Sequence, residues 1–276
     1  MSQMNKYLSP ATFTQPRIIT STSAFGHVPF FFWLISILKP RSIVELGTMY
    51  GYSFFAFCQA AEALQPPADC YAVDTWEGDL NTGKYGEQVY ANVQNYLSEN
   101  FNLEHAHLLR MRFDEAAEKF APGSVDLIFI DGCHTYEAVK EDFLTWKDKM
   151  SDRGVMMFHD TRVEAEGFGV KQFWNEVRVG KPHIEFHHDH GLGILFMGSE
   201  VPGILLDLAR EPEPVSAGIR NAYATIGEKY QHQWDIRVLN RKLQQRDYEI
   251  ELLRGSLSWK LTSPLRLIHS LIGGGR

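Results

Sequence analysis

The sequence lacks the features that mark secreted or membrane-spanning proteins. It has only three cysteines in 276 residues, and an odd number of widely spaced cysteines argues against a disulfide framework or a zinc site. The most apolar run, residues 28–38, is too short to cross a bilayer, and no cleavable signal peptide follows Met1. We therefore expect a cytoplasmic protein whose cysteines are buried free thiols.

An excess of basic residues is also absent. The chain has 27 Lys and Arg against 34 Asp and Glu, which gives a net charge of −7 at pH 7. A nucleic-acid-binding protein needs a basic face to contact phosphates, so we expect no nucleic-acid partner. Apolar residues make up 44% of the chain, which is enough for one full-sized core with an appendage.

Apolar runs alternate with helical patterns over most of the chain. The predicted strands lie near residues 43–47, 70–74, 106–110, 125–131 and 154–159, and the predicted helices near 52–64, 86–98, 114–120, 135–149 and 168–179. Such alternation is typical of a parallel sheet covered on both faces. Two later strands, 183–187 and 192–197, have hairpin spacing. The sequence predicts an α/β, Rossmann-like, doubly wound and mostly parallel seven-stranded sheet with an antiparallel edge hairpin.

These elements divide the chain into three predicted parts. Residues 1–41 form an N-terminal region whose helix, over about 23–38, caps the site. Residues 42–200 form the central ligand-binding domain, and residues 214–276 form a helical extension.

The most informative segment covers residues 42–53 and 70–76. A short buried strand ends at Gly47, and Gly47 and Gly51 let the backbone turn sharply into a helix whose free N–H groups can approach a ligand. A second strand ends at Asp74, where a carboxylate can accept both hydroxyls of a ribose. These residues predict a nucleoside site, with a glycine turn in some other α/β protein as the alternative.

The loop does not suit a dinucleotide. The Gly-x-Gly-x-x-Gly fingerprint is incomplete, and Glu45 just upstream would repel a pyrophosphate but suits a positively charged ligand. S-adenosylmethionine fits this description, because it has a sulfonium, an ammonium and a ribose but no phosphate. The residues expected around this cofactor are Glu45, Gly47, Thr48, Gly51, Ser53, Asp74, Trp76, Asp114 and Asp131.

Polar residues follow two further apolar strands. Asp131 ends one strand and Asp160 the next, so both should emerge beside the cofactor at the carboxyl edge of the sheet. Two carboxylates in one cleft repel each other, which favours a shared divalent ion such as Mg²⁺. His159 is a candidate third ligand that would favour Mn²⁺ or Fe²⁺, or it packs in the core. An ordinary strand-end turn at residues 131–132 is the alternative.

Four motifs resemble a known family in the right order. They are Glu-Leu-Gly-Thr at 45–48, Val-Asp-Thr-Trp-Glu-Gly-Asp at 73–79, Ile-Asp-Gly-Cys-His-Thr-Tyr-Glu-Ala-Val at 130–139 and Phe-His-Asp-Thr at 158–161. They resemble the class I S-adenosylmethionine methyltransferases of the group that contains macrolide and aminocoumarin sugar O-methyltransferases and cephalosporin hydroxylase-like proteins. The resemblance covers about residues 22–198.

The resemblance implies roles for individual residues. Glu45, Gly47 and Asp74 would hold the cofactor, and Asp131 and Asp160 would bind a metal. Some relatives carry a carboxylate at the position of His159, so the ligand set of this chain differs from theirs. The expected reaction is O-methylation of a sugar or glycan hydroxyl, assisted by Mg²⁺ or Mn²⁺.

Such a reaction needs a base, because a sugar hydroxyl is a poor nucleophile until it loses its proton. His134 is the favoured base, since an imidazole titrates near working pH, and Asp131 is the second candidate. The alternative for His134 is a hydrogen bond to the backbone only. The glycine-rich segment 76–86 is expected to close over the acceptor and cofactor as a lid.

The extension carries a short heptad stripe. Its apolar members follow spacings of three and four, with Arg246 interrupting the series, and are Ile236, Leu239, Leu243, Ile250, Leu253 and Leu257. Residues 235–276 contain eight Lys or Arg and four Asp or Glu. The segment 258–266 is similar to tails of bacterial glycan-assembly enzymes. The extension is therefore expected to form a homo-oligomer, to contact the inner face of the membrane or a glycan-assembly enzyme, or to fold back on its own domain.

Two other functions compete with methyl transfer. Tyr136 and Lys140 with Ser124 imitate the catalytic set of a short-chain NAD(P) reductase, but Ser124 precedes its strand and should lie at the opposite end of the sheet from Tyr136. The second is a catalytically silent methyltransferase-like subunit that holds a glycan-assembly complex together, against which the intact Asp131, His134 and Asp160 argue.

Overall fold

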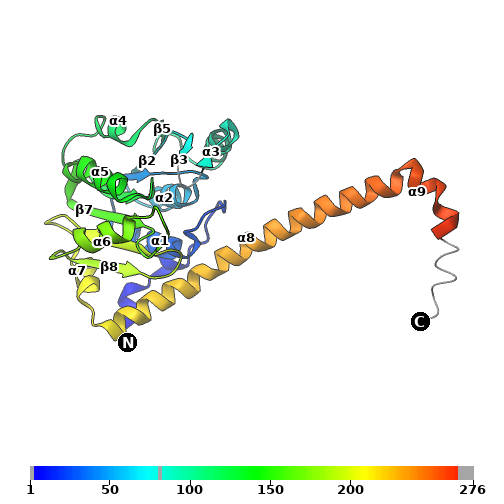
Figure 1. Ribbon diagram of the computed structural model, residues 1–276. Helices are drawn as coiled ribbons and strands as arrows, with labels where there is room; N and C mark the ends of the chain where they lie inside the picture. Colours follow the sequence, from blue (N-terminus) through cyan, green and yellow to red (C-terminus); the bar gives the residue numbers. More distant parts are fainter. Residues whose placement is uncertain (1–2, 80–82, 267–276) are drawn as a thin grey trace. The chain divides into compact units, whose positions relative to one another are not determined.

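The predicted strands form one sheet. The computed structural model describes residues 3–79 and 83–266 (Figure 1). The main sheet has seven strands in the order β5-β2-β1-β6-β7-β9-β8. These are β1 (Ser42–Leu46), β2 (Asp69–Asp74), β5 (Ala106–Arg110), β6 (Val125–Ile130), β7 (Met150–His159), β8 (His183–Phe186) and β9 (Leu192–Phe196).

The strand directions confirm the predicted fold. β1, β2, β5, β6 and β7 are parallel, and β9 runs antiparallel to both β7 and β8. The strand order reverses between β1 and β6, and ligands of doubly wound sheets bind beyond the carboxyl ends of the strands at such a switch point. The arrangement is therefore Rossmann-like, with an antiparallel edge hairpin, and its site is expected beyond β1 and β6.

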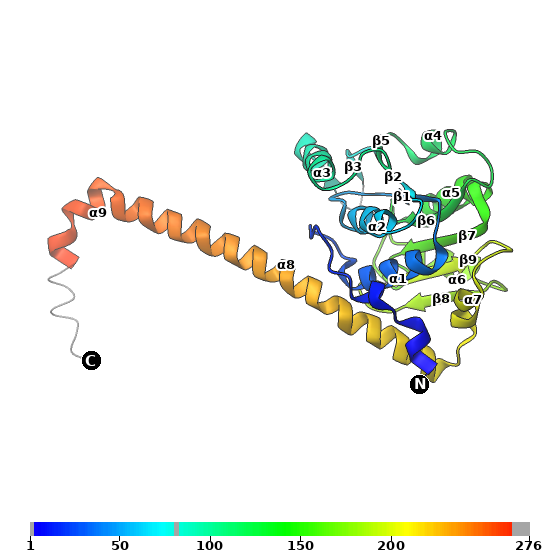
Figure 2. The same cartoon turned by 180° about the vertical axis from the view of Figure 1, so that it is seen from behind.

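Helices cover both faces of the sheet (Figures 1 and 2). One face packs against α4 (Phe113–Ala117), α5 (Tyr136–Trp146) and α6 (Val170–Val177) through Ile128 and Ile130. The other face packs against α1 (Val28–Leu38) and α2 (Tyr52–Glu62), where the ring of Phe129 lies 5.5 Å from that of Phe31 and 5.8 Å from that of Phe57. Because β6 is buried on both faces, its sequence is almost uninterrupted in apolar residues. The remaining helix of this region is α3 (Glu87–Asn100).

Three elements differ from the prediction. β7 begins at Met150 rather than near residue 154, because Ser151 is buried and donates a hydrogen bond to Asp126, which lets polar residues continue the strand. The first helix begins at Val28 rather than near residue 23, with Pro29 in its first turn, where proline's missing N–H breaks no helical hydrogen bond. An unpredicted helix, α7 (Gly203–Arg210), buries Leu205 and Leu208.

The C-terminal extension is helical, as predicted. α8 (Glu213–Gly255) is followed by α9 (Leu257–Leu261). The chain divides into two compact units, residues 1–231 and 232–276, so that α8 contributes to both. No described helix is both long and apolar enough to cross a membrane. Residues 267–276, which include the last apolar part of the predicted surface-binding segment, lie outside the described residues.

The first turns of α8 belong to the core of the first unit. The phenolic hydroxyl of Tyr223 donates to the carbonyl oxygen of Tyr7 at 2.6 Å, and that of Tyr230 donates to the carbonyl oxygen of Thr14 at 2.8 Å. The side chains of Tyr223 and Tyr230 are both buried. These contacts join the N-terminal segment to α8.

Candidate active site

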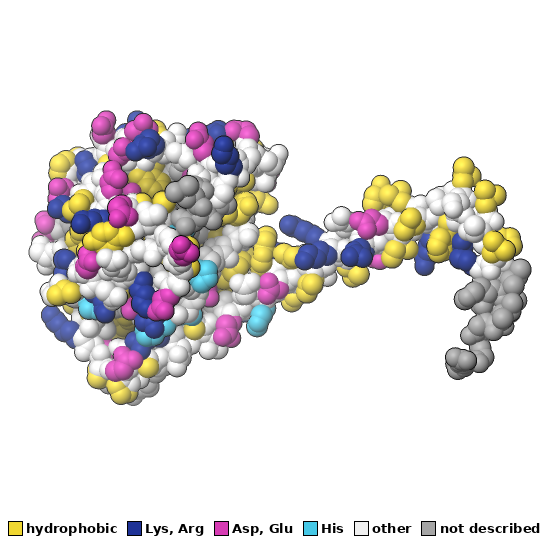
Figure 3. Space-filling view, in the orientation of Figure 1, with side chains coloured by type: hydrophobic (Ala, Val, Ile, Leu, Met, Phe, Trp, Pro, Cys, Tyr) yellow, Lys and Arg dark blue, Asp and Glu magenta, His cyan; other side chains and the backbone are white. Residues whose placement is uncertain are grey.

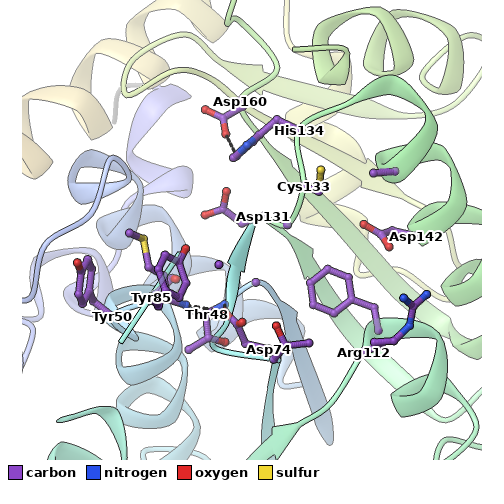
Figure 4. A pocket seen from close by; sticks show the side chains of 18 of the residues that line it. Thr48, Tyr50, Asp74, Tyr85, Arg112, Asp131, Cys133, His134, Asp142 and Asp160 are labelled. Atoms are coloured by element: carbon purple, nitrogen blue, oxygen red, sulfur yellow. Dashed lines mark hydrogen bonds and ion pairs between the residues drawn. The ribbon is translucent and has the colours of Figure 1, made fainter. Parts of the chain in front are cut away.

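A cavity of about 430 Å³ lies at the carboxyl edge of the sheet, where β1, β2, β6 and β7 end (Figure 4). Ligand pockets typically measure about 300–1,000 Å³. Thr48, Asp74, Asp131 and Asp160, which follow or end these four strands, all line it. The sheet therefore brings together the two groups of residues that the sequence places at strand ends.

The loop after β1 is fixed by its backbone. Gly47 and Gly51 have φ values of +91° and +81°, which side chains rarely adopt. A Cβ atom on Gly47 would lie 2.2 Å from the carbonyl oxygen of Asp131, so only glycine fits there. Because Gly47 approaches Asp131 so closely, the loop lies directly against the end of β6. Gly51 precedes the first residue of α2, as predicted.

Asp74 holds this loop from the side of β2. Its Oδ2 accepts hydrogen bonds from the backbone N–H groups of Thr48 and Met49, both at 2.9 Å, and its Oδ1 accepts from the N–H of Trp76 at 2.7 Å. The indole N–H of Trp76 donates to the carbonyl oxygen of Met49 at 3.0 Å. Asp74 therefore lines the cavity with a carboxylate that is already oriented, while Trp76 is buried and supports the loop from behind.

Glu45 lies behind the loop and is fully buried. The hydroxyl of Thr48 donates to one of its carboxylate oxygens at 2.7 Å, and the hydroxyl of Ser53 donates to the other. Burial raises the pKa of Glu45 to about 8, although these two hydrogen bonds oppose the shift. Thr48 and Ser53 line the cavity and Glu45 does not, so its predicted contact with the cofactor stays a prediction.

The opposite side of the cavity is a cluster of carboxylates and imidazoles. Nε2 of His134 lies 2.8 Å from Oδ2 of Asp160, and Nδ1 of His159 lies 3.2 Å from Oδ1 of Asp131 and 3.3 Å from Oδ2 of Asp160. The ring of His134 stacks on Phe168 with centroids 4.7 Å apart. The sheet therefore places the two predicted carboxylates and the predicted base together.

The charges of this cluster stabilise one another. Burial opposes ionisation of Asp160, but the hydrogen bond from His134 and the charge of the nearby His159 outweigh it and hold the pKa of the carboxyl far below its usual range. Burial also opposes protonation of His159, but Asp131 and Asp160 outweigh it and raise the pKa of the imidazole well above its usual value. The cluster thus pairs the ionised carboxylate of Asp160 with a cationic imidazole at His159.

The donor set fits a divalent cation. Ligand atoms of Asp131, His134 and Asp160 all lie within 4.8 Å of one another, the only such group in the described part of the chain. Two carboxylate oxygens with an imidazole nitrogen suit Mn²⁺, Fe²⁺ or Zn²⁺ as well as Mg²⁺. His159, the predicted third ligand, contacts both carboxylates but lies outside this group, and its imidazole is fully buried. Its role as a ligand stays a prediction.

The far end of the cavity is also acidic. Asp114 lines it and forms a two-bond ion pair with Arg112 at 3.0 and 3.1 Å. Asp142 on α5 lines the same end, and burial raises the pKa of its carboxyl to about 7. The lid segment contributes Tyr85 to the wall and forms the short strands β3 (Gly78–Asp79) and β4 (Gly83–Lys84). Residues 80–82 of that segment lie outside the described residues.

Among the residues that sequence reasoning missed are two histidines beside the acidic cluster. Nδ1 of His190, in the turn between β8 and β9, lies 3.2 Å from Oδ1 of Asp160. The ring of His27 lies 5.6 Å from that of His159 and is completely buried. The signal for His190 was present, because a hairpin turn that reads His-Asp-His is unusually rich in metal-binding and titratable groups.

The short-chain reductase alternative fails on the same geometry. Ser124 precedes β6, and its hydroxyl donates to the carbonyl oxygen of Ala121. Tyr136 begins α5 beyond the other end of β6, and its hydroxyl donates to Glu176 at 2.7 Å. These side chains therefore do not share a site.

Comparisons with known proteins agree with the predicted methyltransferase fold. Residues 44–161 match the family described as a methyltransferase domain. The chain is 41% identical over 242 residues to the uncharacterized protein y4gI of Sinorhizobium fredii. That match covers 86% of this chain but 26% of the relative, so the chain spans about a quarter of its length.

Two of the solved structures that share the fold illustrate the similarity. One is a Staphylococcus aureus protein provisionally named as a caffeoyl-CoA O-methyltransferase, with 15% identity and a TM-score of 0.50 over 66% of this chain and 86% of that one. The other is the Podospora anserina methyltransferase PaMTH1, solved with SAH bound, with 14% identity and a TM-score of 0.50 over 64% and 80%. The strand order, the site at its switch point and the match over residues 44–161 agree: the chain has the fold of a class I methyltransferase.

Proposed function

We propose that this protein transfers the methyl group of S-adenosylmethionine to a hydroxyl of a sugar or glycan, with the help of a divalent cation. The observation that carries the proposal is the placement of Asp131, His134 and Asp160 in the same cavity as the loop held by Asp74. One group suits a nucleoside with positive charge, and the other suits activation of a hydroxyl. Transfer of a methyl group to oxygen requires the cofactor and the activated hydroxyl to lie next to each other, as they would in this cavity.

The chain's own residues would divide the work. Asp74 would accept hydrogen bonds from the ribose hydroxyls, and the loop that begins at Gly47 would hold the amino-acid part of the cofactor. The bound cofactor would supply the methyl group. Asp131 and Asp160 would hold the cation, which would lower the pKa of the acceptor hydroxyl. The neutral imidazole of His134 would take the acceptor's proton and, once charged, would pair with the carboxylate of Asp160.

The contact between His134 and Asp160 would also stabilise the protonated His134 that this step forms. Asp160 is only 4% exposed and lies 2.8 Å from His134, so an imidazolium formed at His134 would have an ionised partner in a poorly solvated site. A charged hydrogen bond of this kind is worth about 1.5–3 kcal/mol. The pair therefore favours His134 as the base over Asp131.

The rim of the cavity supports a polyhydroxylated acceptor. Ten of the lining residues carry hydroxyls, and those that are exposed or half-buried include Ser21, Thr22, Ser23, Tyr50 and Tyr85. Hydroxyl groups both donate and accept hydrogen bonds, which suits the hydroxyls of a sugar.

The decisive experiment is transfer of labelled methyl from S-adenosylmethionine to candidate nucleotide sugars and glycan extracts, followed by identification of the methylated position. Label in a sugar hydroxyl would support the proposal. Tight binding of NADH with no response to S-adenosylmethionine would contradict it. Binding of the cofactor without transfer to any acceptor, by a protein with the whole cluster intact, would favour the silent scaffold.

A further inference from the structure

The second compact unit carries a regular row of exposed apolar side chains. Within α8, beyond residue 231, the row consists of Ile236, Leu239, Leu243, Ile250 and Leu253, each 43–63% exposed. Figure 3 shows hydrophobic side chains spaced along this unit between Lys and Arg side chains. Leaving a row of large apolar side chains in water is unfavourable, so this face is expected to be covered.

The identities of these residues indicate what covers them. The alternating spacings of three and four assign Ile236, Leu243 and Ile250 to heptad position a, and Leu239, Arg246 and Leu253 to position d. Isoleucine at a with leucine at d favours a parallel coiled coil of two helices over three or four. Among parallel coiled coils, the row therefore favours two helices rather than three or four.

Charges beside the row favour a second copy of the same helix. In a parallel pair, each g residue faces the e residue of the following heptad on the other helix. Lys242 at g would face Asp247 at e of the second copy, and Glu249 at g would face Arg254 at e. Both pairings are attractive, and the two-fold symmetry of a homodimer makes each of them twice.

We propose that residues 236–253 form a parallel two-stranded coiled coil with a second copy of this chain. Arg246 at a d position weakens the row but sets its register, because a displaced register would bury the guanidinium against leucine or isoleucine. In the proposed register, Arg246 lies beside Asp247 of the second copy, which balances its charge.

A membrane surface explains the same residues less well. Helices that lie on anionic membranes carry a broad apolar face bordered by basic residues. Here Arg246 interrupts the apolar row, and Asp247, Glu249 and Glu251 in the same stretch would be repelled by anionic lipids.

The first test measures the mass of the full-length protein by light scattering and sedimentation equilibrium over a range of concentrations. The wild-type chain should be a dimer. Leu253→Asp should raise its dissociation constant about 100-fold or more, because it places a charge in the seam. Leu252→Asp is the matched control, since Leu252 is the adjacent leucine, is 57% exposed and lies at position c, outside the seam. A monomeric wild-type chain, or equal effects of the two substitutions, would overturn the proposal.

The second test asks whether the two helices are parallel and whether the row binds a second copy or a membrane. Lys242→Glu should weaken the dimer about tenfold by creating two repulsive pairs, and the double change Lys242→Glu with Asp247→Lys should restore it. Failure of the double change to restore the dimer would overturn the parallel register. Sedimentation with vesicles of phosphatidylcholine and phosphatidylglycerol supplies the membrane comparison. A monomer that binds these vesicles, and loses binding equally with Leu252→Asp and Leu253→Asp, would assign the row to a membrane surface instead.

Discussion

Nε2 of His134 lies 2.8 Å from Oδ2 of Asp160, and Asp160 is almost entirely buried. This pair lies across the cavity from the loop held by Asp74, and it gives the proposed chemistry its sharpest test. His134→Ala should lower kcat by about 10²–10⁴-fold with little change in cofactor affinity, because a general base acts in the transition state. Initial rates and calorimetry measure the two effects separately.

His232→Ala, which removes an exposed histidine of α8, is the control for His134→Ala. A normal rate for His134→Ala would remove this residue from the chemistry. Added imidazole should partly restore the rate of the variant, which loss of a purely structural contact would not explain.

Asp74→Ala should weaken S-adenosylmethionine binding by roughly 1.5–3 kcal/mol, the range for a hydrogen bond to a charged group. The substitution also removes the acceptor for the N–H groups of Thr48 and Met49, so the loop should become less ordered. Titration calorimetry checks the affinity. Asp69→Ala, at the other end of the same strand, should leave it unchanged, and equal losses in both variants would mean that β2 rather than the carboxylate had been disturbed.

A chelator should abolish methyl transfer, and Mg²⁺ or Mn²⁺ should restore it, while S-adenosylmethionine still binds. Asp131→Asn should lose the response to added metal without losing the fold. The measurement is transfer rate against free metal concentration. Full activity in excess chelator would show that the acidic cluster works without a cation.

Glu45 should make the stability of the protein depend on pH. Its pKa is about 8 in the folded chain against 4.5 for an ordinary glutamate. A carboxyl group whose pKa is raised in the folded state contributes fully to stability at pH values below its pKa in the unfolded state. This contribution is lost as the pH rises through its pKa in the folded state. Stability should therefore fall between about pH 4.5 and pH 8, by on the order of a few kcal/mol. Glu45→Gln should flatten the decline, as measured by denaturant unfolding across this range.

The exposed Glu99 on α3 supplies the comparison for that experiment. Glu99→Gln should leave the pH dependence as it is in the wild-type chain. An unchanged decline in Glu45→Gln would assign the pH dependence to other groups.

Ending the chain after residue 231 should leave the first unit as stable as it is in the full chain, whereas ending it after residue 214 should destabilise this unit. The shorter product loses the hydrogen bonds that Tyr223 and Tyr230 donate to the N-terminal segment, together with their burial. We expect its melting temperature to fall by more than about 5 °C, since each buried aromatic side chain contributes several kcal/mol. Calorimetry of the two products decides, and equal melting temperatures would show that residues 215–231 do not stabilise this unit.

Much of the site followed from two elementary rules. Apolar strands alternating with helices predict a parallel sheet, and the carboxyl ends of parallel strands meet at one edge, which brings Asp74, Asp131 and Asp160 together. The position of Gly47 also followed, because a sharp turn at the end of a strand favours glycine. These features depend on local pattern, which a sequence displays directly.

What the sequence did not predict depends on register and burial. His190 reaches Asp160 because β9 pairs antiparallel with β7, with Leu192 opposite His159. Pairing between strands more than thirty residues apart has no local signature. The surroundings of Glu45 were missed for a related reason: whether its carboxylate faces a ligand or the chain's own hydroxyls depends on the fold of a turn only a few residues long.

The close approach of Gly47 to the carbonyl oxygen of Asp131 has a consequence for engineering this protein. The floor of the cavity is shaped by main-chain atoms in contact, which no substitution of a side chain can reshape without displacing a strand end. The rim, by contrast, is made of side chains such as Tyr50 and Tyr85 that can be exchanged singly. A library intended to change the acceptor should therefore vary the rim and leave residues 47–51 and 131–132 untouched.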